Sequence, residues 1–191
     1  MPNRPKILQR KIVAQSRLFK VEELHLEFTN GVQRTYERLV SQGHGAVMIV
    51  ALNEREELVL IREYAGGFHD YVLTLPKGLI DAGEDALTAA NRELMEETGY
   101  GAHNLELLTQ LSLAPNYMGH KMDVVLARDL YLCKLEGDEP EPLEVLLYPL
   151  HDLHKLMASD DFHEARSIAA LFLTREKLLY EHEQLQEHHG A

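Results

Sequence analysis

Residues 78–100 read GLIDAGEDALTAANRELMEETGY, and the interpretation of the whole chain starts from this stretch. From Asp85 onward its apolar residues recur at i, i+3 and i+7, which predicts an amphipathic helix. Good helix formers fill the segment, and Gly99 predicts where the helix ends. The three residues that set the apolar spacing are Leu87, Ala90 and Leu94.

Three glutamates share one face of this predicted helix. At about 100° per residue, Glu93, Glu96 and Glu97 fall within an arc of roughly 100°. Carboxylates so close repel one another by a few tenths of a kcal/mol per pair. A solvated acidic face is the simpler interpretation, but a helix built only for stability would interleave lysines. A hard divalent cation, which prefers oxygen ligands, would turn this repulsion into affinity.

Seven residues of the stretch stand at the spacing G-x5-E-x7-R-E-U-x-E-E-x-G-U, in which U is aliphatic. This pattern resembles the signature of the Nudix hydrolases, and Tyr100 at the last U is its one departure. The resemblance implies a mixed sheet in an α/β/α sandwich, hydrolysis of a diphosphate linkage, and Mg²⁺ or Mn²⁺ as cofactor. The matching residues are Gly78, Glu84, Arg92, Glu93, Glu96, Glu97 and Gly99.

Metal ligands are expected among the box glutamates. Glu93 and Glu97, one helical turn apart, are the predicted direct ligands, because Mg²⁺ takes a few carboxylates and completes its shell with phosphate and water. Glu96 is expected to ligate a second ion or to act through water. The resemblance adds a backbone carbonyl near Lys77 or Gly78.

Two further box residues have predicted supporting roles. Arg92 stands four residues before Glu96 and could hold it as an i,i+4 pair. The resemblance implies that Arg92 and Glu84 orient the metal ligands. Alternatively, Glu84 is simply an acidic residue favoured near a helix N-terminus.

The general base is expected outside the box, in the acidic loop at residues 135–142 (LEGDEPEP). In ADP-ribose pyrophosphatases that resemble this chain, a glutamate of the equivalent loop serves as base or extra ligand. Glu139 and Glu141 lie nearest that role, and Glu141 is preferred. A solvated acidic turn is the alternative interpretation.

Composition limits the partners and the compartment. The chain has 191 residues, enough for one domain, and a net charge of −12, which argues against nucleic acid or an anionic membrane as partner. The apolar run at residues 46–52 is too short to span a bilayer, and MPNRPK lacks the apolar stretch of a signal peptide. A single cysteine, Cys133, suits a reducing cytoplasm. We therefore expect a cytoplasmic protein.

The chain is expected to form one Nudix domain, 1–191, with an N-terminal β unit at 1–42 and a catalytic core at 43–191. The N-terminal unit is a β-hairpin extension, because Thr29-Asn30-Gly31 is a strong turn signal. Strands are predicted at 18–28, 32–40, 46–52, 57–63, 71–75, 105–112, 122–132 and 145–148, and further helices at 151–158 and 162–186.

Substrate residues must lie outside the box. In Nudix enzymes that cleave ADP-ribose a proline follows the box, where Pro115 stands, and in the dinucleoside-polyphosphate class a tyrosine lies just beyond, at Tyr117. Arg38 and Arg62 could pair with diphosphate oxygens. Aromatic rings that could stack on adenine, each equally well explained as core or surface residues, are those of Phe28, Tyr36 and Tyr117.

Resemblance extends over nearly the whole chain to Nudix hydrolases of ADP compounds, through stretches such as LVLIREYA, LSLAPNYM and LEGDEPEPL. It implies ADP-ribose, NADH and Ap3A as substrates, AMP as a product, and a homodimer in which the N-terminal β unit contacts the partner. Two alternatives stay open. One is a hydrolase of other nucleoside diphosphate-linked compounds, and the other is an ADP-ribose sensor without activity, which would be expected to lack box glutamates.

Overall fold

The computed structural model describes residues 3–40 and 43–189, which divide into two compact units. Residues 1–42 and 112–121 belong to the first unit, and residues 43–111 and 122–191 to the second. The segment 112–121 joins the first unit through a hydrogen bond from the Leu39 N–H to the Tyr117 carbonyl, at 2.7 Å. Each unit is described by itself.

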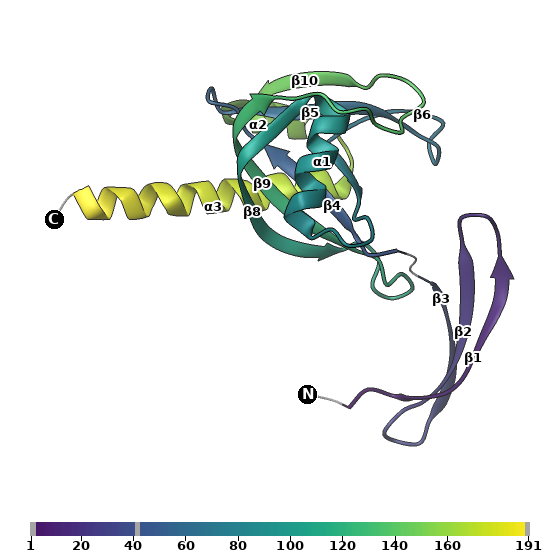
Figure 1. The fold of residues 1–191 in the computed structure, drawn as a ribbon. Coiled ribbons are helices and arrows are strands. Elements are labelled where there is room, and N and C mark those ends of the chain that lie inside the picture. Colours follow the sequence, from purple (N-terminus) through teal and green to yellow (C-terminus); the bar gives the residue numbers. More distant parts are fainter. Residues whose placement is uncertain (1–2, 41–42, 190–191) are drawn as a thin grey trace. The chain divides into compact units, whose positions relative to one another are not determined.

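The first unit is an antiparallel sheet in the order β1-β2-β3 (Figure 1). Its strands are β1 (Lys6–Gln15), β2 (Lys20–Glu27) and β3 (Gln33–Leu39), so the predicted hairpin is present and its turn holds Gly31 at φ 79°. Strand β1 was not predicted. Its apolar residues come in adjacent pairs, and two register irregularities interrupt the two-residue alternation that would have revealed it.

The second unit contains two sheets, with strand orders β7-β4-β9-β8 and β10-β5-β6. Strand β4 pairs parallel with β9 and antiparallel with β7, which makes its sheet mixed. The strands are β4 (Ala46–Ala51), β5 (Glu57–Ala65), β6 (Asp70–Thr74), β7 (Lys77–Leu79), β8 (Tyr100–Ser112), β9 (Lys121–Leu132) and β10 (Glu144–Pro149).

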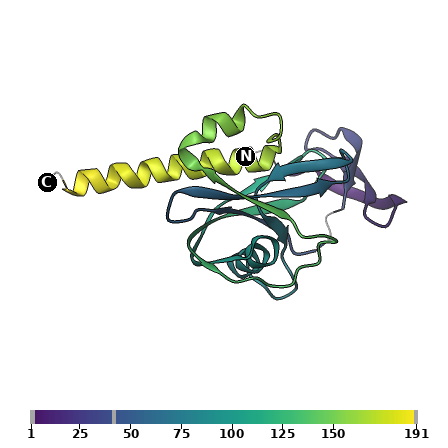
Figure 2. The ribbon, with the colours of Figure 1, turned by 90° about the horizontal axis from the view of Figure 1, so that it is seen from above.

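Alternate residues of the buried strand β4 face two different cores. Val47 and Ile49 pack with the helix α1 (Ala86–Thr98), whereas Met48 and Val50 pack with α2 (Leu153–Met157), its preceding 3-10 turn η1 (Leu150–Asp152) and α3 (Ala165–His189). Figure 2 shows α1 on one side of the strands and α2 and α3 on the other. The predicted α/β/α sandwich with a mixed sheet is confirmed.

The box helix α1 has the ends that its sequence predicts. The Asp85 carboxylate accepts a hydrogen bond from the Thr88 N–H at 2.8 Å and caps the N-terminus. Gly99 at the C-terminus has φ 79°, and its N–H donates to the Met95 carbonyl. The long C-terminal helix starts at Ala165, three residues later than predicted, because Glu164 caps it by accepting from the Ser167 N–H at 2.8 Å.

No helix within residues 3–40 and 43–189 is both long and apolar enough to cross a membrane.

Replacing Gly99 by alanine should destabilise the protein, because φ 79° is a left-handed conformation that disfavours a Cβ atom. We expect the free energy of unfolding, measured by urea denaturation, to fall by about 1–2 kcal/mol. Gly67→Ala is the matched control, since an added Cβ there meets nothing within 4 Å. An equal loss in both variants would contradict this explanation.

Candidate active site

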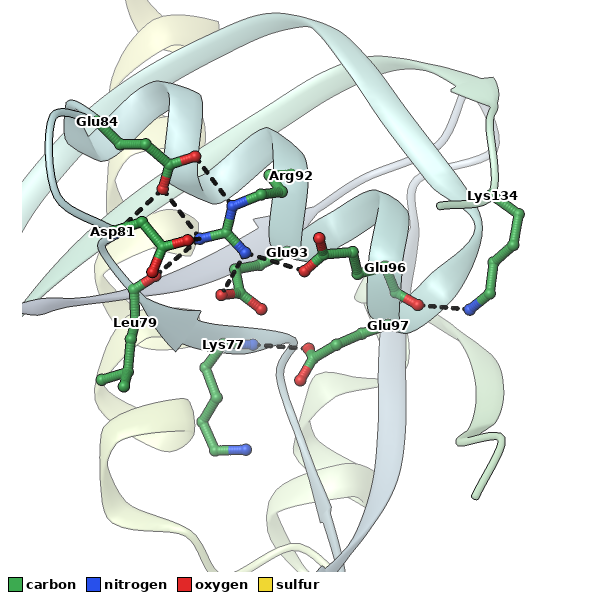
Figure 3. A network of polar contacts seen from close by, with 9 residues as sticks. All are labelled: Lys77, Leu79, Asp81, Glu84, Arg92, Glu93, Glu96, Glu97 and Lys134. Atoms are coloured by element: carbon green, nitrogen blue, oxygen red, sulfur yellow. Dashed lines mark hydrogen bonds and ion pairs between the residues drawn. The ribbon is translucent and has the colours of Figure 1, made fainter. Parts of the chain in front are cut away.

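The guanidinium of Arg92 holds three box glutamates together (Figure 3). Its Nε and Nη2 donate to the two carboxylate oxygens of Glu84, each at 2.9 Å. Its Nη1 donates to Glu93 and to Glu96, also at 2.9 Å, and Nη2 reaches the carbonyl of Leu79. The predicted i,i+4 pair with Glu96 is therefore present. These bonds raise the pKa of Arg92, and the bidentate pair lowers the pKa of Glu84.

Strand β7 lies directly against the Glu93 carboxylate. A Cβ atom on residue 78 would overlap the Glu93 carboxylate, so glycine at this position lets the carboxylate lie directly on the strand backbone. Burial raises the pKa of Glu93, although the Arg92 guanidinium lowers it. Strand β7, which covers this carboxylate, was not among the predicted strands, because three residues are too few to show a period.

Glu97 is the most deeply buried carboxylate of the box, with only 5% of the residue exposed. Its Oε2 accepts a hydrogen bond from the backbone N–H of Lys77 at 2.9 Å. The ammonium group of Lys77 is paired with Glu63 instead. Burial raises the pKa of Glu97 to about 8, and the nearby Glu63 and Glu93 contribute to the rise.

These residues suit a hard divalent cation by their chemistry. Glu93, Glu96 and Glu97 offer only oxygen donors, and Glu97 carries a buried carboxylate whose charge lacks full compensation. Within residues 3–40 and 43–189, no three His, Cys, Asp or Glu side chains are already placed to hold an ion, since Glu93 and Glu96 are bonded to Arg92. The donor set fits the metal, and binding would require these side chains to turn from Arg92.

The acidic loop lies over the C-terminal half of α1. Both predicted loop glutamates, Glu139 and Glu141, line a cavity of about 290 Å³ together with Glu96 and Glu97. Burial raises the pKa of Glu139, with smaller contributions from Glu63 and other neighbours. Glu141 instead accepts a hydrogen bond from the hydroxyl of Tyr71.

The predicted substrate residues are divided between the two units, and both predicted arginines are paired with carboxylates. Arg62 lies within β5, where its Nη atoms donate to both oxygens of Asp161 at 2.7 and 2.8 Å and its Nε to Glu144. In the first unit, Arg38 is paired with Glu22 at 2.7 Å. The remaining predicted residues also belong to the first unit, and they are Phe28, Tyr36, Pro115 and Tyr117.

Three side chains near the box were not anticipated from the sequence. Glu63 neutralises the Lys77 ammonium, Tyr71 holds Glu141, and Lys134 donates to the main-chain carbonyl of Glu96. Lys77 is 14 residues from Glu63, and Tyr71 is 70 from Glu141, so no local spacing could have revealed these pairs.

Comparison with known proteins agrees with this geometry. The family described as NUDIX domain matches residues 43–183, and the NudE-type Nudix hydrolase N-terminal domain matches residues 5–38. The chain belongs to the Nudix hydrolase family.

Relatives within the family cover almost the whole chain. The chain is 53% identical over 175 residues to the ADP compounds hydrolase NudE of Escherichia coli, covering 92% of this chain and 94% of the relative. It is 30% identical over 173 residues to an ADP-ribose pyrophosphatase of Bacillus subtilis, covering 87% and 92%. A crystal structure of an ADP compounds hydrolase superposes with a TM-score of 0.89 at 51% identity and covers 95% of this chain and 97% of its own.

Removing the buried charge of Glu97 should stabilise the metal-free protein at alkaline pH. Its folded pKa of about 8 lies above the ordinary value of about 4.3, so stability falls as pH rises between the two. In EDTA at pH 8.5, we expect Glu97→Gln to raise the free energy of unfolding by about 1–3 kcal/mol and to flatten its pH dependence. Urea denaturation from pH 5 to 9 measures both.

Glu183→Gln on the exposed surface of α3 is the control, and it should leave the pH profile unchanged. A Glu97→Gln variant that is less stable than the wild type at pH 8.5 in EDTA would refute the assignment of an uncompensated buried charge.

Proposed function

We propose that this Nudix hydrolase cleaves the diphosphate linkage of ADP-containing compounds, including ADP-ribose, NADH and Ap3A, and releases AMP. The observation that carries the proposal is the buried Glu97 carboxylate beside Glu93 and Glu96, a set of hard oxygen donors. Similarity to the Escherichia coli ADP compounds hydrolase over 92% of the chain supports the substrate class.

The metal would be held by Glu93, Glu97 and the backbone carbonyl of Lys77, with Glu96 serving a second ion or a water. When bound, Mg²⁺ or Mn²⁺ supplies Lewis acidity and lowers the pKa of its water. Arg92 and Glu84 act as positioning residues. The two hydrogen bonds between them hold the Arg92 guanidinium in one orientation, and the guanidinium in turn orients the box carboxylates. The bound metal would also offset the repulsion between a chain of net charge −12 and the phosphates of its substrate.

Hydrolysis requires that a water oxygen attack one phosphorus while the bridging P–O bond breaks. AMP departs with one of the two phosphates, and the proton of the water must be accepted by a base. Among the loop glutamates, Glu139 is the better candidate in this structure. Burial raises the pKa of Glu139 above its ordinary value, which makes it a stronger base, whereas Glu141 is bonded to Tyr71.

Substrate contacts are proposed at the positions that the sequence predicts. Arg62 would meet a diphosphate only if Asp161 and Glu144 released it. Arg38, Pro115 and the possible adenine-stacking rings lie in the first unit and are proposed on the family resemblance. Those rings are Phe28, Tyr36 and Tyr117, and Phe28 and Tyr36 have centroids 6.3 Å apart.

The proposal includes a cytoplasmic homodimer. The exposed apolar residues of β1 support a contact between two copies of the chain, because sheet surfaces of this kind seldom face water alone. They are Ile7, Leu8, Ile12 and Val13. A single cysteine, Cys133, supports a reducing compartment.

Incubation with Mg²⁺ and, separately, with ADP-ribose, NADH, Ap3A or dGTP should yield AMP from the three ADP compounds. Chromatography measures the product. Glu97→Gln should lower turnover by on the order of 100-fold or more, because it removes a charged ligand, and Glu183→Gln should not. Tight metal-dependent binding of ADP-ribose without turnover would instead favour a sensor, and turnover of dGTP alone would favour another nucleotide class.

The two loop glutamates can be separated by matched substitutions. We expect Glu139→Gln to lower kcat by about 100-fold or more and to remove the acidic limb of its pH profile, because a base is lost. Glu141→Gln should have a much smaller effect. The reverse order of the two effects would reassign the base to Glu141.

A further inference from the structure

A cavity of about 350 Å³ opens in the second unit beside the proposed active site. One wall comes from β5, β6 and the turn between them, with Tyr64 and Phe68, and the other from the segment that leads into α3, with His163 and Arg166. The rings of Phe68 and His163 meet edge to face, with centroids 5.3 Å apart. Phe68 is 71% exposed although it is a large apolar side chain.

Lys77 connects this cavity to the metal-binding carboxylates. Its backbone N–H donates to Glu97, while its side chain extends away from α1 (Figure 3) and lines the cavity together with Glu63. A substrate with its diphosphate at the box carboxylates could therefore place one of its two halves in this cavity.

The charges that line the cavity are paired. Lys77 is bonded to Glu63, and Arg166 Nε donates to Glu164 at 2.7 Å. Each acidic side chain of the lining therefore has a basic partner. Aromatic rings, the apolar Val72, Ala65 and Ala165, and the hydroxyl-bearing Thr74 supply the rest of the surface. Such a lining suits an uncharged planar ring.

Its size and its polar groups restrict the occupant further. A volume of about 350 Å³ is at the small end of ligand pockets and holds one nucleoside, not a dinucleotide. Among residues 3–40 and 43–189, the lining contains no Asn or Gln, the side chains that pair with the edge of adenine, so recognition here would depend on stacking. Stacking tolerates different bases because every base has a π-face.

All the proposed substrates share the AMP half with its adenine. They differ in the group at the other end of the phosphate bridge. We infer that the cavity between Phe68 and His163 binds the second base of a dinucleotide, the ribosylated planar ring at the other end of the phosphate bridge. An incoming ring replaces His163 as the stacking partner of Phe68. This inference rests on the proposed function, and it makes dinucleotides with two bases preferred over ADP-ribose, which has one.

The experiment compares the wild type with Phe68→Ala, Phe68→Tyr and Tyr180→Ala. Tyr180 is an exposed aromatic residue far along α3 and is the control for loss of a surface ring. Phe68→Ala should lower kcat/KM for NADH and Ap3A about tenfold more than for ADP-ribose, since a stacking contact is lost. Phe68→Tyr, which keeps the ring, should retain the wild-type ratio, and so should Tyr180→Ala.

Binding of reduced nicotinamide mononucleotide gives a second readout, independent of hydrolysis. It has no diphosphate linkage, and its own fluorescence reports binding in EDTA. We expect binding to the wild type, Phe68→Tyr and Tyr180→Ala, and a loss of about tenfold in affinity for Phe68→Ala. Failure of the proposed function would abolish AMP release from every substrate but leave this binding result intact.

Two results would overturn the inference. An equal loss for NADH, Ap3A and ADP-ribose in Phe68→Ala would assign the cavity to the shared AMP half. Unchanged mononucleotide binding and unchanged substrate ratios in Phe68→Ala, with hydrolysis otherwise normal, would show that no base stacks there.

Discussion

The ion pairs of Arg92 are the interaction on which the active site depends. One guanidinium bonds three glutamates that would otherwise repel one another more strongly, on adjacent turns and in the preceding loop. Because Glu84 binds two of its nitrogens, the guanidinium is held in one orientation, with Nη1 directed at Glu93 and Glu96. The carboxylates on the acidic face of α1 are thereby held together in one cluster.

Glu97 lies outside this network. Its buried charge lowers the stability of the metal-free fold. Its carboxylate has one backbone donor and a raised pKa, which is the expected behaviour of a buried charge without a full partner. A divalent cation would lower that pKa and recover the stability. Affinity for metal and instability without it therefore have the same physical origin.

Core packing positions the elements that carry these carboxylates. Alternate residues of β4 pack against α1 on one face and against α2 and α3 on the other, and β7, paired to β4, presses Gly78 onto the Glu93 carboxylate. The backbone of this strand limits the movement of the Glu93 carboxylate on one side.

The sequence by itself determined the family, the box helix with both of its ends, and the Arg92–Glu96 pair, because these follow from spacing within one short stretch. The fold class was implied by the family resemblance. It could not reveal strand β1, whose alternation is broken by bulges, nor β7, which is too short to show a period. Only the tertiary structure decided the partners of Arg62, the Glu63–Lys77 pair, the contact of Tyr71 with Glu141, and the cavity beside Phe68. These depend on segments distant in the chain, and their contacts arise only when the sheets and α3 pack together.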